Sequence, residues 1–170
     1  MASLPNKTDA RIDLLISRMK ECIQKESFSR IQSLAINSLV SGIKEDLSQF
    51  NVNFDTWYSE NSLVQSGALE TMVTRLKNSG FLYEKDGAWW FRSSDLGDEK
   101  DRVVIRANGS HTYFATDIAY HMEKLDRGFD QLINVWGADH HGHISRMKTV
   151  VGALGANPDD LTIMLTQMVA

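Results

Sequence analysis

Strand-like segments alternate with amphipathic segments over the last third of the chain. The strand-like segments occupy 111–114, 131–136 and 161–168, and helical patterns at about 116–127 and 140–154 separate them. Gly128 and Gly155 stand where each helix is expected to stop. Consecutive β-α-β units form right-handed crossovers in a parallel sheet, and three strands make half of a doubly wound fold. The pattern predicts an α/β fold class with half of a Rossmann-type parallel sheet (β-α-β-α-β).

Polar side chains follow two of these predicted strands. The run Leu132 to Trp136 is short and bulky, as expected for a strand buried on both faces. After it, Asp139, His140, His141 and His143 crowd the next turn, and Tyr113 and Asp117 follow the preceding strand in the same way. Open α/β sheets bind ligands beyond the carboxyl ends of their strands. If the two strands are parallel neighbours, we therefore expect both clusters to open into one pocket.

The segment 1–61 is predicted to be helical. Apolar residues recur at helical spacing in two stretches, one from Ile12 to Ile23 and one from Phe28 to Leu47. A face as wide as the second one usually packs against a protein core, so we expect both helices to be buried along their apolar side.

The segment 62–110 is predicted to be an insertion with a helix and β-hairpins. A helix from about Ser62 would turn Leu69, Met72, Val73 and Leu76 inward and stop at Gly80. The pairs Asp86-Gly87 and Asn108-Gly109 each sit between strand-like runs and favour primed hairpin turns. The acidic stretch 93–101 between the hairpins is expected to be a solvated loop. The segment 111–170 is then a Rossmann half-domain, which we expect to be truncated at its C-terminus because the chain stops where a ligand-facing loop is due.

Composition limits the function classes. A net charge of −4 and a pI near 5.7 argue against a free-standing nucleic-acid binder, which usually has a basic face. The single cysteine, Cys22, fits a reducing compartment. The sequence has no apolar run long enough for a membrane span and no signal peptide pattern. We expect a cytoplasmic protein that does not bind a membrane.

Three interpretations of Asp139-His140-His141 compete. Asp and His are suitable donors for zinc or manganese, and Asp-His-His names a family of manganese phosphoesterases. The earlier aspartate motifs of that family are absent, and adjacent histidines on a helix diverge. Alternatively, the histidines are structural. In the third interpretation this is a nucleotide and amino-acid pocket, where Gly137 allows close backbone approach and Asp139 accepts ribose hydroxyls.

Several separated motifs together resemble the arginyl-tRNA synthetases. They are Glu84-Lys85-Asp86-Gly87-Ala88-Trp89-Trp90-Phe91-Arg92-Ser93, Gly97-Asp98-Glu99-Lys100-Asp101-Arg102-Val103, Thr112-Tyr113-Phe114-Ala115-Thr116-Asp117-Ile118-Ala119-Tyr120-His121 and Trp136-Gly137-Ala138-Asp139-His140-His141-Gly142. The resemblance implies a class I enzyme that uses ATP, with Mg²⁺, to make arginyl-adenylate and then charges tRNA(Arg). On this comparison the chain is an internal fragment that holds the insertion and the second Rossmann half.

The resemblance also implies roles for five residues. Tyr113 and Asp117 would bind the guanidinium of L-arginine, with His140 near the α-amino or carboxylate end. Gly137 and Asp139 would bind the adenosine ribose. The class I signatures His-Ile-Gly-His and Lys-Met-Ser-Lys-Ser are absent from the sequence, so we assign no catalytic residue. We also assign no metal ligand on this interpretation. We expect the isolated chain to be inactive. The alternatives are a metal-dependent phosphoesterase of the Asp-His-His type and a non-catalytic α/β interaction domain.

Overall fold

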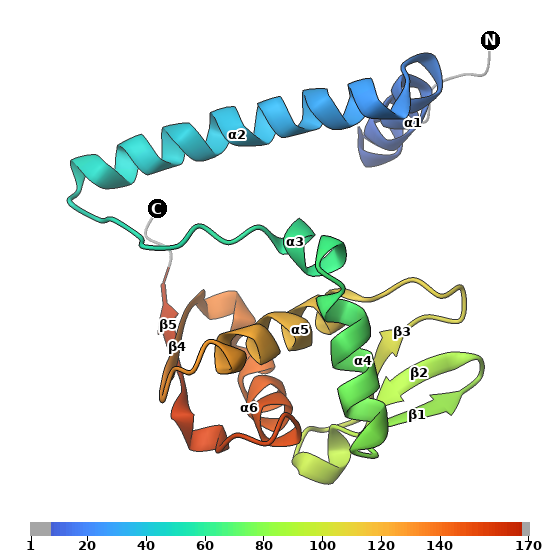
Figure 1. The fold of residues 1–170 in the computed structure, drawn as a ribbon, viewed down its shortest axis with the longest axis vertical. Coiled ribbons are helices and arrows are strands. Elements are labelled where there is room, and N and C mark those ends of the chain that lie inside the picture. Colours follow the sequence, from blue (N-terminus) through green and yellow to red (C-terminus); the bar gives the residue numbers. More distant parts are fainter. Residues whose placement is uncertain (1–7, 168–170) are drawn as a thin grey trace. The chain divides into compact units, whose positions relative to one another are not determined.

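The computed structural model describes residues 8–167 and divides the chain into two compact units, Met1–Trp57 and Tyr58–Ala170. The ribbon in Figure 1 shows two helices in the first unit and a mixed α/β arrangement in the second. The sequence placed its first boundary after Asn61, whereas the units of the structure meet between Trp57 and Tyr58.

The first unit consists of α1 (Thr8–Cys22) and α2 (Lys25–Gln49). The expectation that their apolar faces are buried is wrong for the described residues: Leu34 is 62% exposed and Leu39 is 69% exposed. Helical periodicity identifies an apolar face, but it does not supply the surface that would cover it. Near the end of the unit the Lys44 ammonium lies 4.9 Å from the centre of the Trp57 ring, a cation–π contact.

The second unit begins with α3 (Glu60–Gln65) and α4 (Ala68–Asn78), where the sequence predicted one continuous helix. Gly67 separates them because it adopts φ 75°, which no helical residue can share. The core prediction for this segment is confirmed for Leu69, Met72 and Leu76, which are buried, whereas Val73 is only partly buried against the same core.

An antiparallel sheet follows, with strand order β1-β2-β3 (Leu82–Lys85, Ala88–Phe91 and Arg102–Ile105). The first hairpin is confirmed, because Asp86 and Gly87 have φ values of 54° and 72° and β1 pairs with β2. The second predicted hairpin is reduced to a single bridge between Ile105 and His111.

The predicted strand at 111–114 is wrong. Thr112 caps α5 (Tyr113–Asp126), so the helix begins inside the segment that was predicted to be a strand. After α5 come β4 (Leu132–Gly137), the 3₁₀ helix η2 (Ala138–His143), α6 (Ile144–Ala153), the short η3 (Pro158–Asp160) and β5 (Leu161–Thr166). β4 and β5 pair in parallel, with Leu132 opposite Leu161. The α/β class is therefore confirmed, but within residues 8–167 the parallel sheet has two strands.

The parallel sheet is covered on one face only among the described residues. Leu132 and Leu161 join the core that contains Ile118 of α5 and Val151 of α6. On the opposite face Ile133 is 61% exposed and Val135 is 63% exposed. The prediction of a strand buried on both faces is therefore wrong for β4.

The acidic segment 93–101 is also less solvated than its composition suggests. It contains the 3₁₀ helix η1 (Ser94–Leu96), and the residue Asp98 is only 8% exposed. The Asp98 carboxylate accepts two hydrogen bonds from Arg102, at 2.9 and 3.1 Å, and a third from the backbone N–H of Glu99. Burial raises the pKa of Asp98, but these bonds outweigh that effect and hold the pKa below its usual value. A paired carboxylate can be buried where an unpaired one cannot.

Candidate functional site

The first two turns of α5 carry the residues expected to bind arginine. The Thr112 hydroxyl accepts a hydrogen bond from the backbone N–H of Ala115 and donates one to the carbonyl of Val103, which ties the start of α5 to β3. Residues four apart lie on one face of a helix, so Tyr113 and Asp117 point to the same side. The structure therefore brings these two predicted residues together.

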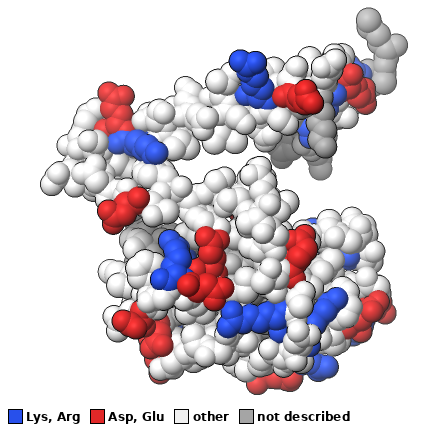
Figure 2. All heavy atoms as spheres, viewed as in Figure 1, with Lys and Arg blue, Asp and Glu red and all other residues white. Residues whose placement is uncertain are grey.

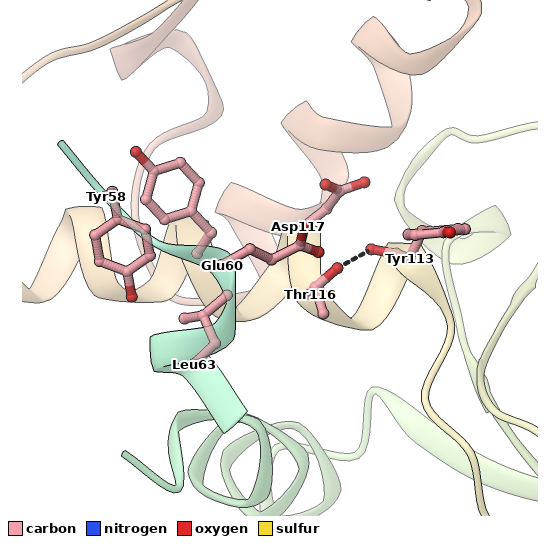
Figure 3. Close-up of a pocket in the computed structure, with 7 residues that line it drawn as sticks. Tyr58, Glu60, Leu63, Tyr113, Thr116 and Asp117 are labelled. Carbon is pink, nitrogen blue, oxygen red and sulfur yellow. Dashed lines mark hydrogen bonds between the residues drawn. The ribbon is translucent and has the colours of Figure 1, made fainter. Parts of the chain in front are cut away.

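A cavity of about 360 Å³ lies against this face of α5. Glu60 extends from the start of α3 toward Thr116 and Asp117, as Figure 3 shows. Leu63 and the rings of Tyr58 and Tyr120 complete the lining. A neighbouring cavity of about 380 Å³ shares Glu60, Tyr113 and Thr116. The Tyr113 residue, 83% exposed, therefore lies between two adjoining cavities.

Two carboxylates face the first cavity. The Asp117 side chain accepts no hydrogen bond from any described residue, and the helix cap is Thr112, so Asp117 does not serve as the cap. Although Asp117 is open to solvent at the cavity, the protein around it partly desolvates the carboxyl, and this burial raises its pKa. The negative charge of Glu60 raises it further, whereas Arg146, His140 and Lys124 act in the opposite direction. A carboxylate of this kind is stabilised by an incoming cation.

Two aromatic side chains add to this preference for a cation. The Tyr58 and Tyr120 rings pack with centroids 4.7 Å apart and planes tilted by 32°, and the Tyr58 hydroxyl donates a hydrogen bond to Glu123. The Lys124 ammonium already lies 4.5 Å from the centre of the Tyr120 ring. Ring faces attract cations, so a planar cation could lie between carboxylates and aromatic surfaces here.

A series of hydrogen-bonded polar side chains links α5 to β4. His121 Nδ1 lies 2.8 Å from the Asp117 carbonyl oxygen, and His121 Nε2 lies 2.9 Å from Asn134 Nδ2 on β4. Lys124 Nζ donates to Asn134 Oδ1 at 2.7 Å. Burial lowers the pKa of His121 to about 4, and burial also lowers the pKa of Lys124 to about 8. These hydrogen bonds fix the turn that carries Asp117 against β4.

The other three predicted site residues lie in the turn after β4. Asp139 folds back over Gly137, since a Cβ atom added to Gly137 would lie 2.5 Å from Asp139 Oδ1. His140 Nε2 lies 3.6 Å from Asp139 Oδ2, and its ring lies 5.9 Å from that of Trp136. Gly137, Asp139 and His140 do not line the cavity that holds Asp117. His140 is nevertheless close enough for its charge to lower the pKa of Asp117.

Comparison with known proteins assigns a family to this arrangement. Residues 6–168 match the family model described as tRNA synthetases class I (R), catalytic domain. The chain belongs to the arginine–tRNA ligase family. It is 51% identical over 156 residues to the arginine–tRNA ligase of Thioalkalivibrio sulfidiphilus, a match that covers 92% of this chain and 27% of that protein. It is 48% identical over 168 residues to the enzyme of Desulfosudis oleivorans, covering 99% of this chain and 30% of that protein. The chain thus spans less than a third of the length of these ligases.

Solved structures of the arginine–tRNA ligase family share the fold. The crystal structure of a Campylobacter jejuni protein described as an arginyl-tRNA synthetase aligns with a TM-score of 0.81 at 36% identity, over all of this chain and 39% of that one. The Thermus thermophilus arginyl-tRNA synthetase aligns with a TM-score of 0.74 at 18% identity, over 94% of this chain and 35% of that one. The predicted resemblance to this family is confirmed.

Nothing in these comparisons favours the metal-dependent phosphoesterase. Among residues 8–167, no three His, Cys, Asp or Glu side chains are grouped closely enough to hold a metal ion. In the same part of the chain, none of the helices combines the length and the apolar character that crossing a bilayer requires.

Sequence reasoning missed the residues that complete the candidate pocket from outside α5. Tyr58 and Glu60 lie 55 and 57 positions before Tyr113 and Asp117, respectively, in the segment 1–61, which we predicted only to be helical. Tyr120 was missed as well, although it lies within the Thr112–His121 motif. Its position one turn after Asp117 could have indicated that it shares the same face of α5.

Proposed function

We propose that this chain is part of an arginine–tRNA ligase that activates L-arginine with ATP and transfers it to tRNA(Arg). Membership of the family supports the ligase reaction. The observation that carries the choice of amino acid is the cavity into which Asp117 and Glu60 both present carboxylates. A guanidinium is planar, permanently charged and rich in hydrogen-bond donors, so it is the amino-acid side chain that this cavity fits best.

Asp117 has the central role in arginine recognition in this proposal. Its carboxylate has no described hydrogen-bond partner, so its oxygens are free to accept two parallel N–H bonds from the guanidinium. Glu60 supplies a second negative charge from α3, and Tyr113 supplies a flat polar side chain beside the pocket. His140, in the turn after β4, would lie toward the α-amino or carboxylate end of arginine.

Gly137 and Asp139 are proposed to bind the adenosine ribose of ATP. The absence of a Cβ atom on Gly137 leaves room for the Asp139 carboxylate to fold over the end of β4. That carboxylate is exposed on the side of the sheet where the strands end, and its oxygens can accept bonds from two ribose hydroxyls. ATP would enter with Mg²⁺ on its phosphates. The cytoplasm, where charged tRNA is consumed, is the location that we propose.

Aminoacylation by the full-length ligase that contains this chain tests the proposal. The enzyme should charge tRNA(Arg) with arginine and should catalyse arginine-dependent exchange of pyrophosphate into ATP. Lysine is the matched control, because it carries the same charge without the planar fork. Equal use of lysine and arginine, or phosphodiesterase activity without aminoacylation, would contradict the proposal.

A further inference from the structure

A third cavity, of about 690 Å³, lies between residues 98–102 and the start of α6. It is separate from the arginine pocket, since the two share no lining residue. Four of its lining side chains are cations, namely Lys100, Arg102, Arg146 and Lys148, and two are carboxylates, Asp98 and Glu99. The cavity therefore has an excess of positive charge, although both signs are interspersed over the visible face of the second unit (Figure 2).

The cations of this cavity differ in the hydrogen bonds and ion pairs that they make within the protein. Arg102 makes two hydrogen bonds to Asp98, so its charge is largely neutralised. Lys148 Nζ lies 3.3 Å from Asp159 Oδ1 in an exposed ion pair, which contributes little to stability. Arg146 is the exception: its side chain is only 16% exposed, yet it donates no hydrogen bond to any described residue.

Neighbouring groups hold the Arg146 side chain in place, but its guanidinium donates no hydrogen bond to a described residue. Its guanidinium lies 5.7 Å from the centre of the Phe114 ring, and its Nε forms an ion pair with Asp98 Oδ2 at 3.7 Å that is too long to be a hydrogen bond. Nε is fully shielded from solvent, so a ligand in the cavity cannot reach it. The two terminal guanidinium nitrogens also donate no hydrogen bond to a described residue, and Arg146 lines the cavity. Buried polar groups in folded proteins nearly always have partners, so these terminal nitrogens indicate an acceptor bound in the cavity.

The surroundings select the chemistry of that acceptor. Arg146 lies in the first turn of α6, a helix whose N-cap residue, His143, makes no side-chain capping bond. The positive end of the helix dipole therefore adds to the charges of Arg146, Lys100 and Lys148. Guanidinium groups bind phosphate through paired N–H donors, and several cations around one cavity suit an anion with more than one charge.

We propose that this cavity binds a phosphate group, with Arg146 as its principal contact and Lys100 and Lys148 as secondary ones. The phosphate has two candidate sources, a nucleotide and an RNA backbone, and the choice of these two rests on the proposed function. Asp98 pairs with Arg102 and also lies beside Arg146, so it keeps both guanidinium groups in position. The phosphate would then bind cations that are already in place.

Titration of the 170-residue chain in the absence of arginine tests this inference apart from the arginine pocket. The two probes are metal-free ATP and a short single-stranded RNA, each followed by calorimetry at low and at raised salt. Binding of ATP alone would assign the site to a nucleotide, and binding of RNA alone would assign it to an RNA backbone. In either case the affinity should fall as salt rises, because phosphate contacts release counterions.

The decisive variant is Arg146→Met, which keeps an apolar stem over Phe114 and removes the guanidinium. It should weaken binding of the probe about tenfold, since charge-assisted bonds are lost. Arg127→Met is the matched control: Arg127 also lies over an aromatic ring, 5.5 Å from that of Phe129, but outside the cavity. This control should bind like the unaltered chain. If Arg146→Met does not fold in a thermal melt, the exposed pair Lys100→Met and Lys148→Met should weaken binding instead.

Two results would overturn the inference. One is that neither probe binds the unaltered chain. The other is that the folded variant Arg146→Met, or the double lysine variant in its place, binds as tightly as Arg127→Met. A failure to bind arginine in a separate titration would count against the proposed function and would leave this result untouched.

Discussion

The side-chain amide of Asn134 on β4 hydrogen-bonds to two residues of α5, His121 through its nitrogen and Lys124 through its oxygen. Lys124 can only donate, so Asn134 Oδ1 faces it, and Asn134 Nδ2 must donate to Nε2 of His121. His121 is therefore neutral with its proton on Nδ1, which donates to the Asp117 carbonyl. The amide sets the protonation of the ring beneath the candidate arginine pocket.

Removal of this amide should destabilise the second unit. Asn134→Ala leaves His121 Nε2 and Lys124 Nζ without their partner in a buried setting, and we expect the free energy of unfolding to fall by about 2–4 kcal/mol. Urea unfolding measures the loss. Asn61→Ala is the control, because Asn61 is exposed on α3 and makes no side-chain hydrogen bond within residues 8–167. Equal losses in the two variants would show that the amide has no special role.

Stability should depend on pH through His121. Its pKa is lowered from 6.5 to about 4 by burial and by Lys124, so the folded state favours the neutral ring. The contribution of the neutral ring is fully present above pH 6.5 and is lost as the pH falls from 6.5 to about 4. We expect a loss of about 3 kcal/mol over this window.

Urea unfolding across that pH range measures this loss. His121→Gln should remove most of the dependence, because glutamine does not titrate. Asp98 and Asp101, whose pKa values are held below 3.8, act at lower pH. Burial lowers the pKa of His143 and raises the pKa of Asp117, but both groups are present in both proteins, so the difference between the two pH profiles isolates His121. A stability that falls equally in the unaltered chain and in His121→Gln would contradict the assignment.

Asp117→Asn should impair the use of arginine in the full-length ligase. The substitution removes one charge from a partly desolvated ion pair, and we expect a loss of about 2–5 kcal/mol in kcat/KM for arginine. The KM for ATP and the Tm should change little, since Thr112 and not Asp117 caps α5. Asp126→Asn, at the exposed end of the same helix, is the control. Near-normal arginine kinetics in Asp117→Asn would refute the guanidinium role.

Gly137→Ala should weaken the binding of ATP by displacing the Asp139 carboxylate. The new methyl group would lie 2.5 Å from Asp139 Oδ1, so the carboxylate must rotate away, whereas the backbone at φ −66° accepts alanine without strain. We expect the KM for ATP in the full-length ligase to rise about tenfold, as for a lost pair of ribose bonds. Gly42→Ala, with no atom near the added methyl, should leave it unchanged. An unaltered KM in Gly137→Ala would argue against ribose binding by this turn.

The 170-residue chain alone should show no arginine-dependent exchange of pyrophosphate into ATP. Adenylate formation requires positioned groups that stabilise the transferring phosphate, and the sequence contains neither class I signature that supplies them. The full-length ligase is the positive control. Exchange by the purified chain, free of host enzyme, would mean that these residues suffice for catalysis.

Local patterns predicted the parts of the structure that depend on neighbouring residues. Asp86-Gly87 gave the first hairpin through backbone preferences, and Gly128 and Gly155 ended their helices with positive φ. Tyr113 and Asp117 were expected at one crevice because both come at the end of a predicted strand, whereas the structure brings them together through a helical spacing of four. Each of these inferences needs only a few consecutive residues.

The remaining parts depend on distant partners. The run 111–114 looked like a strand until the Thr112 hydroxyl, bonded to Val103, set the start of a helix. Asp98 is buried because Arg102 pairs with it, which composition alone does not indicate. The wide apolar face of α2 showed which residues could be buried but not what would cover them. Glu60 was missed because its role arises from a cavity that packing creates.

The exposed apolar face of the β4–β5 pair should make this chain associate with other copies of itself in solution. Ile133, Val135 and Met164 are exposed on it, and within residues 8–167 the outer edges of both strands have no further strand to pair with. Such surfaces recruit other copies by strand addition and apolar contact. Light scattering should therefore report a mass that rises above 19.2 kDa with concentration. Charged residues at these three positions would improve yield and storage while leaving the candidate arginine pocket on α5 intact.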